Sequence, residues 1–112
     1  MSDGSLTLTE FLLARIAERE RGAKVDLRVA RWPNSMTARN ARWDLADCEA
    51  KRRIMELADD ATMLDIHVDG EFRVGARDEA AEPYCGDRIL RALALPYADH
   101  PDYQEEWGVA TA

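Results

Sequence analysis

The chain has 112 residues and a mass of 12.7 kDa, and its formal net charge is −7. Apolar residues make up 46% of it, but 18 of them are alanines, and leucine, isoleucine, valine and phenylalanine together number only 22. This composition suits one domain with a thin, mainly helical core and argues against a large buried active-site cavity. We therefore expect a single domain over residues 1–112, with an ordered core at about 6–107 and short tails at 1–5 and 108–112.

The sequence also disfavours several classes of protein. We expect no secretory signal and no membrane span, because the longest apolar runs, such as residues 11–14, have only four residues. Cys48 and Cys85 lack the spacing of a disulfide framework, which indicates reduced thiols in a cytoplasmic protein. The scattered glycines form no phosphate-binding loop, and no nucleophile motif surrounds Ser35.

The charge is distributed unevenly along the chain. Residues 1–56 carry 11 basic and 9 acidic side chains, whereas residues 57–112 carry 4 basic and 13 acidic ones. The acidic total argues against generic nucleic-acid binding. The two oppositely charged halves either attract each other within the fold or face different partners.

The first predicted helix spans about residues 8–21. Thr7 and Glu10 have the spacing of a capping box, and Leu6 and Phe11 occupy the positions of a hydrophobic staple around it. An apolar stripe at three- and four-residue steps follows, and we expect Gly22 to end the helix.

The next segment reads as a short strand at 25–29 and a turn at 32–35, followed by a second helix at about 38–59. Apolar residues mark one shallow face of that helix, which either packs on the domain or forms a seam between two copies. They are Trp43, Ala46, Ala50, Ile54, Leu57 and Ala61. The acidic pair at 59–60 opposes the helix dipole, so we expect the helix to stop there.

Residues 63–74 alternate between polar and apolar side chains and predict a β-hairpin. A three-residue loop at 68–70 pairs Ile66 with Phe72 and Leu64 with Val74, which gathers the apolar side chains on one face.

The last third of the chain begins with a predicted exposed loop at 75–83, followed by a third helix at about 86–95. A short final helix, capped by Asp99 or His100, would place Tyr103 and Trp107 against the body of the domain. The predicted fold class is therefore α+β and mostly helical, with three main helices, one β-hairpin and a short C-terminal helix.

Two stretches carry a resemblance to a known family: residues 48–54, CEAKRRI, and residues 93–107, LALPYADHPDYQEEW. The beginning of the first helix at 8–12 is also similar. On these residues the sequence resembles the domain-of-unknown-function family 6221, small proteins of actinobacteria and their phages. The region of the predicted hairpin departs from the family pattern. The resemblance implies a host lineage and supplies no catalytic residues.

Two groups of residues are candidates for a reactive site. Cys48, His67, Cys85 and His100 are metal-ligand types, but their wide separations differ from the short clips of structural zinc sites. Asp99, His100, Asp102 and Glu106 crowd one short segment, where helix capping explains most of the pattern and a surface that mimics the phosphates of DNA is an alternative. We therefore expect no cofactor, no bound metal and no enzymatic activity, with a metal-dependent hydrolase as the disfavoured alternative.

Basic and aromatic residues interleave at Arg28, Arg31, Trp32, Arg39, Arg42 and Trp43. Such a segment can hold phosphates and stack bases, but the preferred interpretation makes both tryptophans core anchors and pairs the arginines with the acidic second half. The sequence thus favours a non-enzymatic interaction protein, an actinobacterial or phage accessory factor that binds a host or phage protein. The candidate contact residues are this segment and the acidic C-terminal group. The alternative is a nucleic-acid-associated protein, and a homodimer remains open.

Overall fold

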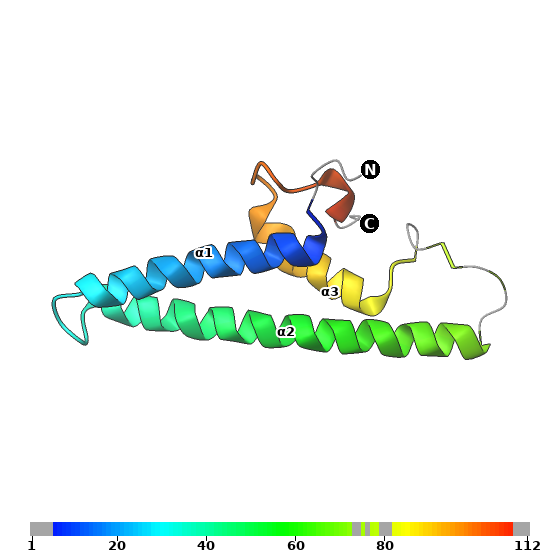
Figure 1. Ribbon diagram of the computed structural model, residues 1–112, viewed down its shortest axis with the longest axis horizontal. Coiled ribbons are helices and arrows are strands. Elements are labelled where there is room, and N and C mark those ends of the chain that lie inside the picture. Colours follow the sequence, from blue (N-terminus) through cyan, green and yellow to red (C-terminus); the bar gives the residue numbers. More distant parts are fainter. Residues whose placement is uncertain (1–5, 73–74, 76, 79–81, 109–112) are drawn as a thin grey trace.

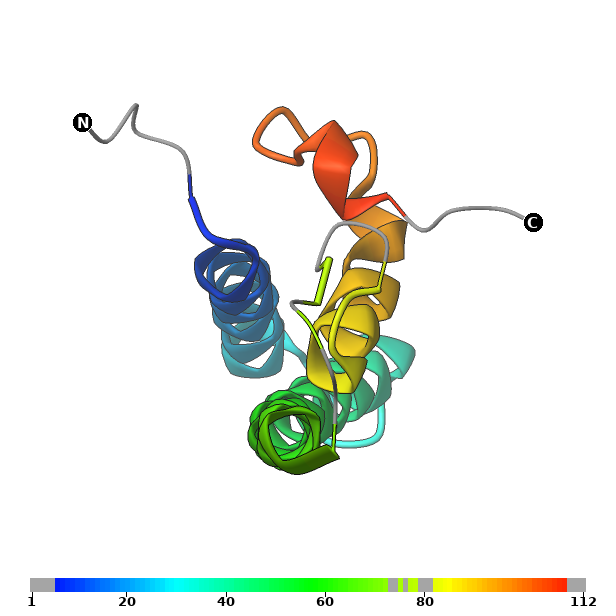
Figure 2. The same cartoon turned by 90° about the vertical axis from the view of Figure 1, so that its right-hand side faces the viewer.

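The computed structural model describes residues 6–72, 75, 77–78 and 82–108. Two long antiparallel helices, α1 (Leu8–Val29) and α2 (Met36–Phe72), form a helical hairpin, and α3 (Cys85–Ala94) crosses it beside the start of α1 (Figure 1). Two short 3-10 helices follow, η1 (Leu95–Tyr97) and η2 (Glu105–Trp107). The molecule measures 61 × 31 × 29 Å, and in end view the three helices occupy the corners of a triangle (Figure 2).

The predicted α+β class is wrong, because the described residues contain three helices and no strand. Residues 63–72 of the expected hairpin continue α2, and residues 73–74 lie outside the described part. Extending an existing helix adds one hydrogen bond for each residue fixed, whereas an isolated two-stranded hairpin is marginal in water. Leu64 and Val68, which alternate like strand residues, also lie four residues apart on one side of a helix.

The predicted end of the first helix is also wrong, since α1 passes through Gly22 and includes the expected strand at 25–29. A glycine inside a helix costs about 1 kcal/mol relative to alanine. Packing offsets this cost, because Ala23 is buried in the hairpin. The expected turn at 32–35 is confirmed and connects α1 to α2.

The start of α1 is confirmed at the atomic level. The Thr7 hydroxyl accepts a hydrogen bond from the Glu10 N–H (3.1 Å), and the Glu10 carboxylate accepts one from the Thr7 N–H (2.9 Å). This reciprocal pair satisfies two backbone donors that a helix N-terminus leaves free. The hydrogen bonds between Glu10 and Thr7 lower the pKa of the Glu10 carboxyl group.

The core lies where the start of α1 meets the C-terminal segment. Phe11 is fully buried, and its ring contacts four aromatic rings, with centroids at 5.1–6.1 Å. Those rings belong to Tyr97, His100, Tyr103 and Trp107. The predicted packing of Tyr103 and Trp107 on the body is therefore confirmed. The short final helix is a 3-10 turn at Glu105–Trp107, later than the predicted capping at 99–100.

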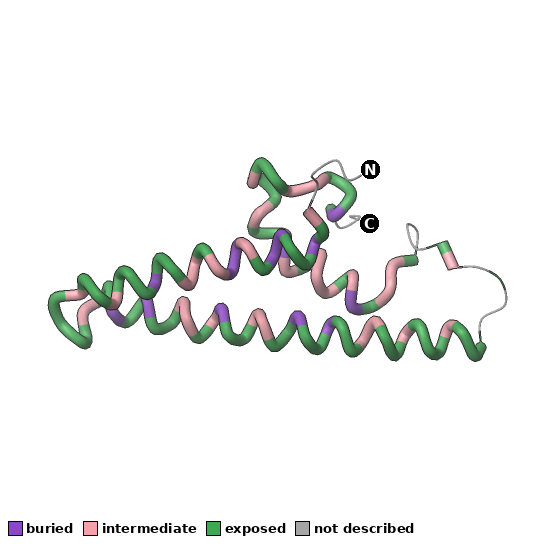
Figure 3. Tube along the Cα trace, in the orientation of Figure 1, coloured by how far each residue is buried: buried purple, intermediate pink, exposed green. Residues whose placement is uncertain are grey.

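α2 buries a different face from the one that the sequence marks as most apolar. Its buried residues are small or unbranched: Ala38, Ala41, Cys48, Met55 and Ala58. Leu57 on the marked face is 64% exposed. Figure 3 shows buried positions along the first part of α2 and only intermediate and exposed ones toward its end. The helix also continues through the acidic pair at 59–60, because α3 packs beside Ala58 and Thr62.

α3 confirms the third predicted helix to within one residue. Its first N–H, that of Cys85, donates to the Asp65 carboxylate at 3.0 Å, so a side chain of α2 caps α3 from outside its own segment. Arg77 in the preceding linker lies between the same carboxylate and Asp69, at 3.5 and 3.3 Å. These contacts bind the linker and α3 to the second half of α2. Residues 1–5, most of 108–112 and parts of the predicted loop at 75–83 lie outside the described residues.

Candidate functional site

The basic and aromatic segment forms one end of the molecule. Residues 24–43 comprise the last turns of α1, the connecting loop and the first turns of α2, and we call them the hairpin tip (Figure 1). The tip carries five basic side chains and one acidic one, a net charge of +4 in a chain of net charge −7. The basic residues are Lys24, Arg28, Arg31, Arg39 and Arg42. The turn of the helical hairpin therefore concentrates positive charge at one end.

Both tryptophans of the tip face solvent. Trp32 is 64% exposed and Trp43 is 65% exposed, so the expectation that they anchor the core is wrong. Each ring has a guanidinium over it: Arg31 lies 5.7 Å from the Trp32 centroid, and Arg19 lies 5.8 Å from that of Trp43. The core stays thin here because the helices meet through Ala23, Ala38 and Ala41, which leave no room for an indole between them.

The loop of the tip has a defined local structure. The Ser35 hydroxyl accepts a hydrogen bond from the Ala38 N–H at 3.1 Å, which caps the start of α2. Arg42 donates to the carbonyl oxygen of Pro33 at 2.8 Å and so holds the loop against the helix. Arg42 is thus engaged in structure, whereas Arg28, Arg31 and Arg39 form no ion pair with any described residue.

Ion pairs next to the tip bind the two long helices together. Arg19 of α1 reaches Asp44 at 2.7 Å and Asp47 at 2.5 Å, and Arg52 of α2 reaches Glu20 at 2.6 Å. Lys51, and then Arg19, lower the pKa of Asp47, and Arg52 lowers that of Glu20. All these residues belong to the first half of the sequence, so the oppositely charged halves are not joined by the ion pairs seen among the described residues.

The second predicted group, Asp99, His100, Asp102 and Glu106, lies away from the tip, beside the start of α1. His100 is engaged in the core: its ring packs on Phe11 at 5.4 Å, its Nε2 contacts the guanidinium of Arg15, and its Nδ1 accepts from the Asp102 N–H at 3.0 Å. The carboxylates of Asp99, Asp102 and Glu106 belong to exposed residues. His100 therefore holds the segment, while the acids around it face solvent.

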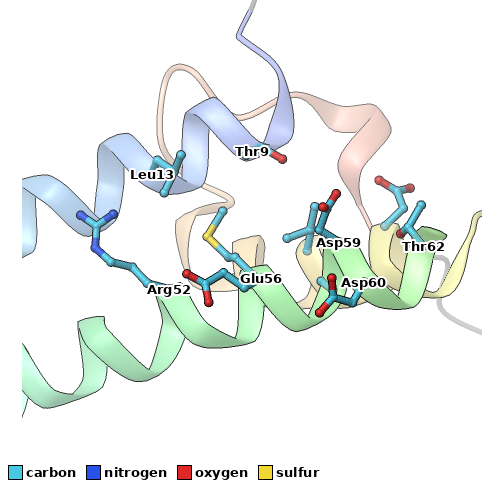
Figure 4. A pocket seen from close by; sticks show the side chains of 11 residues that line it. Thr9, Leu13, Arg52, Glu56, Asp59, Asp60 and Thr62 are labelled. Atoms are coloured by element: carbon cyan, nitrogen blue, oxygen red, sulfur yellow. The ribbon is translucent and has the colours of Figure 1, made fainter. Parts of the chain in front are cut away.

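A solvent-open groove of about 620 Å³ lies between the three helices (Figure 4). Its lining is rich in carboxylates, and its one basic side chain, Arg52, is bound to Glu20. The lining residues are Thr9, Leu13, Arg52, Met55, Glu56, Ala58, Asp59, Asp60, Thr62, Asp87 and Leu90. The sequence pattern does not indicate this groove, because the predicted second helix ends at the acidic pair 59–60.

The four candidate metal ligands, Cys48, His67, Cys85 and His100, do not lie close together. Cys48 is buried between α1 and α2, Cys85 is exposed at the start of α3, and His67 pairs with Glu71 along α2 at 3.1 Å. Within the described residues, no three histidine, cysteine or carboxylate side chains are grouped as metal ligands would be. None of the helices in that part of the chain is both long and apolar enough to span a membrane.

Comparison with known proteins identifies the family. The model of a family of unknown function, DUF6221, matches residues 6–109, which include the three α-helices and both 3-10 helices of the described part of the chain. No curated protein and no solved structure matches the chain. The match extends across residues 63–74, the region that departs from the expected family pattern in the sequence. The chain belongs to the family of unknown function DUF6221.

Proposed function

We propose that the protein is a non-enzymatic, cytoplasmic binding protein whose hairpin tip contacts a protein partner, a host or phage protein in an actinobacterial cell. The observation that carries this proposal is the exposure of large apolar side chains where the chain turns. Val29 is 70% exposed, Trp32 64% and Met36 68%, and all three lie within eight residues of one another. Apolar side chains gathered in this way on a small domain are typical of interaction sites.

The surroundings of these side chains support a protein as the partner. Arg28, Arg31 and Arg39 flank them, and tryptophan and arginine are the residues most enriched at the energetic centres of protein interfaces. Valine and methionine add apolar contact area that a phosphate backbone does not need. The fitting partner therefore has an apolar recess rimmed by acidic side chains.

A comparison of matched variants tests the proposal. The native chain and the variants Trp32→Ala and Leu95→Ala are immobilised in parallel to capture binding partners. Leu95→Ala is the matched control, because Leu95 is 50% exposed and lies far from the tip. A partner of the tip is retained by the native chain and by Leu95→Ala, and it is lost with Trp32→Ala. With the purified partner, we expect Trp32→Ala to weaken binding by at least about tenfold. Equal capture by all three proteins would refute a role for the tip.

Single-stranded nucleic acid is the second candidate partner. Two exposed indoles beside guanidinium groups, in a segment of charge +4, match the stacking and charge pattern of single-strand binders. The test is a tryptophan-fluorescence titration with oligonucleotides at increasing salt. Salt-sensitive quenching that Arg31→Ala and Arg39→Ala abolish would favour nucleic acid over protein, whereas unchanged fluorescence would remove this candidate.

A further inference from the structure

The groove between the three helices combines apolar side chains with carboxylates. Each helix contributes one large apolar residue to its lining: Leu13, Met55 and Leu90. Glu56, Asp59 and Asp60 follow one another along α2 at one border (Figure 4). The volume of about 620 Å³ is within the range of about 300–1,000 Å³ typical of ligand pockets, so one aromatic side chain can enter the groove.

Three carboxylates of the groove are not neutralised within the described chain. Asp87 pairs with Arg91 at 2.9 Å, and Arg52 is bound to Glu20 at 2.6 Å. The other acids of the lining have neither an ion pair nor a hydrogen bond with a described residue, and they are Glu56, Asp59 and Asp60. Two of them lie four residues apart on one helix, where like charges repel. The groove therefore favours a cationic occupant.

The hairpin tip carries the complementary set of groups. Arg28, Arg31 and Arg39 form no ion pair with any described residue. Trp32 is 64% exposed, and the Arg31 guanidinium lies 5.7 Å from its ring centroid, so an indole that enters the groove brings a cation to the border. The chain outside the tip has a net charge of −11, which makes the tip the part of a second copy that this groove attracts.

The tip and the groove of one chain cannot meet. Met36 begins α2 at the tip, and Asp59 lies about 35 Å farther along the axis of the same continuous helix, at 1.5 Å per residue. A contact between a tip and a groove must therefore join two chains.

We propose that the groove receives the hairpin tip of a second copy of this chain. Trp32 lies between the apolar side chains, and the free arginines of the tip lie beside the three unpaired carboxylates. This inference rests on the proposed function of the tip as a contact surface, and it identifies an apolar recess with an acidic border that fits the tip. The contact joins two different surfaces, head to tail. A tip held in this way is covered until the host or phage partner displaces the second copy.

The first test is the mass in solution of the native chain and of two charge-reversed variants. Asp59→Arg/Asp60→Arg alters the groove, whereas Asp99→Arg/Asp102→Arg makes the same change of charge at exposed residues of the C-terminal segment. At tens of micromolar we expect at least twice 12.7 kDa for the native chain and the C-terminal variant, and a monomer with unchanged helical circular dichroism for the groove variant. A native monomer up to about 100 µM, or equal masses for the two variants, would overturn the proposal.

The second test mixes two variants that each lack one of the two surfaces. Arg31→Glu/Trp32→Ala keeps a native groove, and Asp59→Arg/Asp60→Arg keeps a native tip. We expect each variant alone to be a monomer and the equimolar mixture to form a one-to-one complex of about twice 12.7 kDa, since one tip and one matching groove remain. A mixture that stays monomeric would overturn the contact between tip and groove.

Partner capture separates this inference from the proposed function. The groove variant retains its tip, so it should still capture the partner of the tip while it fails to self-associate. Capture by a native chain that is itself monomeric would overturn only the second copy as occupant. Self-association without capture would support the second copy and refute the host or phage partner. A native monomer that binds an arginine-rich peptide in the groove would overturn the inference in favour of a basic segment of another protein.

Discussion

Gly86 of α3 lies directly against the carbonyl oxygen of Ala58 in α2. A Cβ atom at residue 86 would overlap that oxygen and the hydroxyl of Thr62. The two helices therefore cross at backbone contact, and only glycine permits the approach. This crossing places α3 between the start of α1 and the second half of α2, and it forms the groove shown in Figure 4.

Gly86→Ala is expected to destabilise the fold by about 2 kcal/mol or more, because a backbone carbonyl cannot move aside as a flexible side chain can. Urea unfolding followed by circular dichroism measures the effect. Gly22→Ala is the matched control: nothing lies within 4 Å of its added methyl group, and helix propensity predicts a gain of about 0.5–1 kcal/mol. Equal stability of the two variants would contradict the close crossing.

Trp107→Ala is expected to destabilise the fold by about 3 kcal/mol or more. Trp107 is 7% exposed, and its ring lies 5.1 Å from Phe11 and 5.6 Å from Tyr103. Trp32→Ala removes the same side chain from an exposed site, and there we expect a change within about 0.5 kcal/mol. The thermal unfolding midpoints of the two variants test this difference in stability. An unchanged midpoint for Trp107→Ala would show that the C-terminal segment is not part of the core.

Acid should weaken the contact between α1 and α2. Lys51 and Arg19 lower the pKa of Asp47, and Arg52 lowers that of Glu20, so each carboxylate is more acidic in the folded chain than in the unfolded one. Their contribution is complete above the ordinary carboxyl pKa of about 4 and is lost as the pH falls through the lowered values.

Urea unfolding between pH 7 and pH 3 tests this dependence. We expect Asp47→Asn to be less stable than the native chain at pH 7, with the difference shrinking toward pH 3. Glu49→Gln removes an exposed carboxylate whose one ion pair among the described residues is with Arg53, and its curve should follow the native one. A constant difference between Asp47→Asn and the native chain at every pH would rule out the linkage.

The two cysteines should react at very different rates. Cys48 is fully buried, its thiol approaches the Ile16 carbonyl oxygen, and burial raises its pKa, whereas Cys85 is exposed at the start of α3. With a thiol reagent at neutral pH, we expect one fast equivalent in the native chain and none in Cys85→Ser until urea is added. Rapid labelling of folded Cys85→Ser would mean that α1 and α2 separate readily.

The elements that were predicted correctly are those encoded by nearby residues. The capping box of Thr7 and Glu10 needs only its own four residues to act, and α3 has an apolar pattern limited by Pro96. The packing of Trp107 could also be predicted from the neighbouring sequence, in which aromatic residues recur among acidic ones. In each case the local signal and the tertiary structure agree.

Local sequence patterns are sufficient to predict the start of α1, the third helix, the anchoring of the C-terminal aromatics and the basic character of residues 24–43. The full lengths of α1 and α2 depend instead on contacts between the helices. α1 continues through Gly22 because Ala23 packs on α2, and α2 continues through Asp59 because α3 crosses beside it at Gly86. Packing also selects which side of α2 is buried: close approach of the helices favours small side chains, so larger apolar residues such as Leu57 and Leu64 remain exposed.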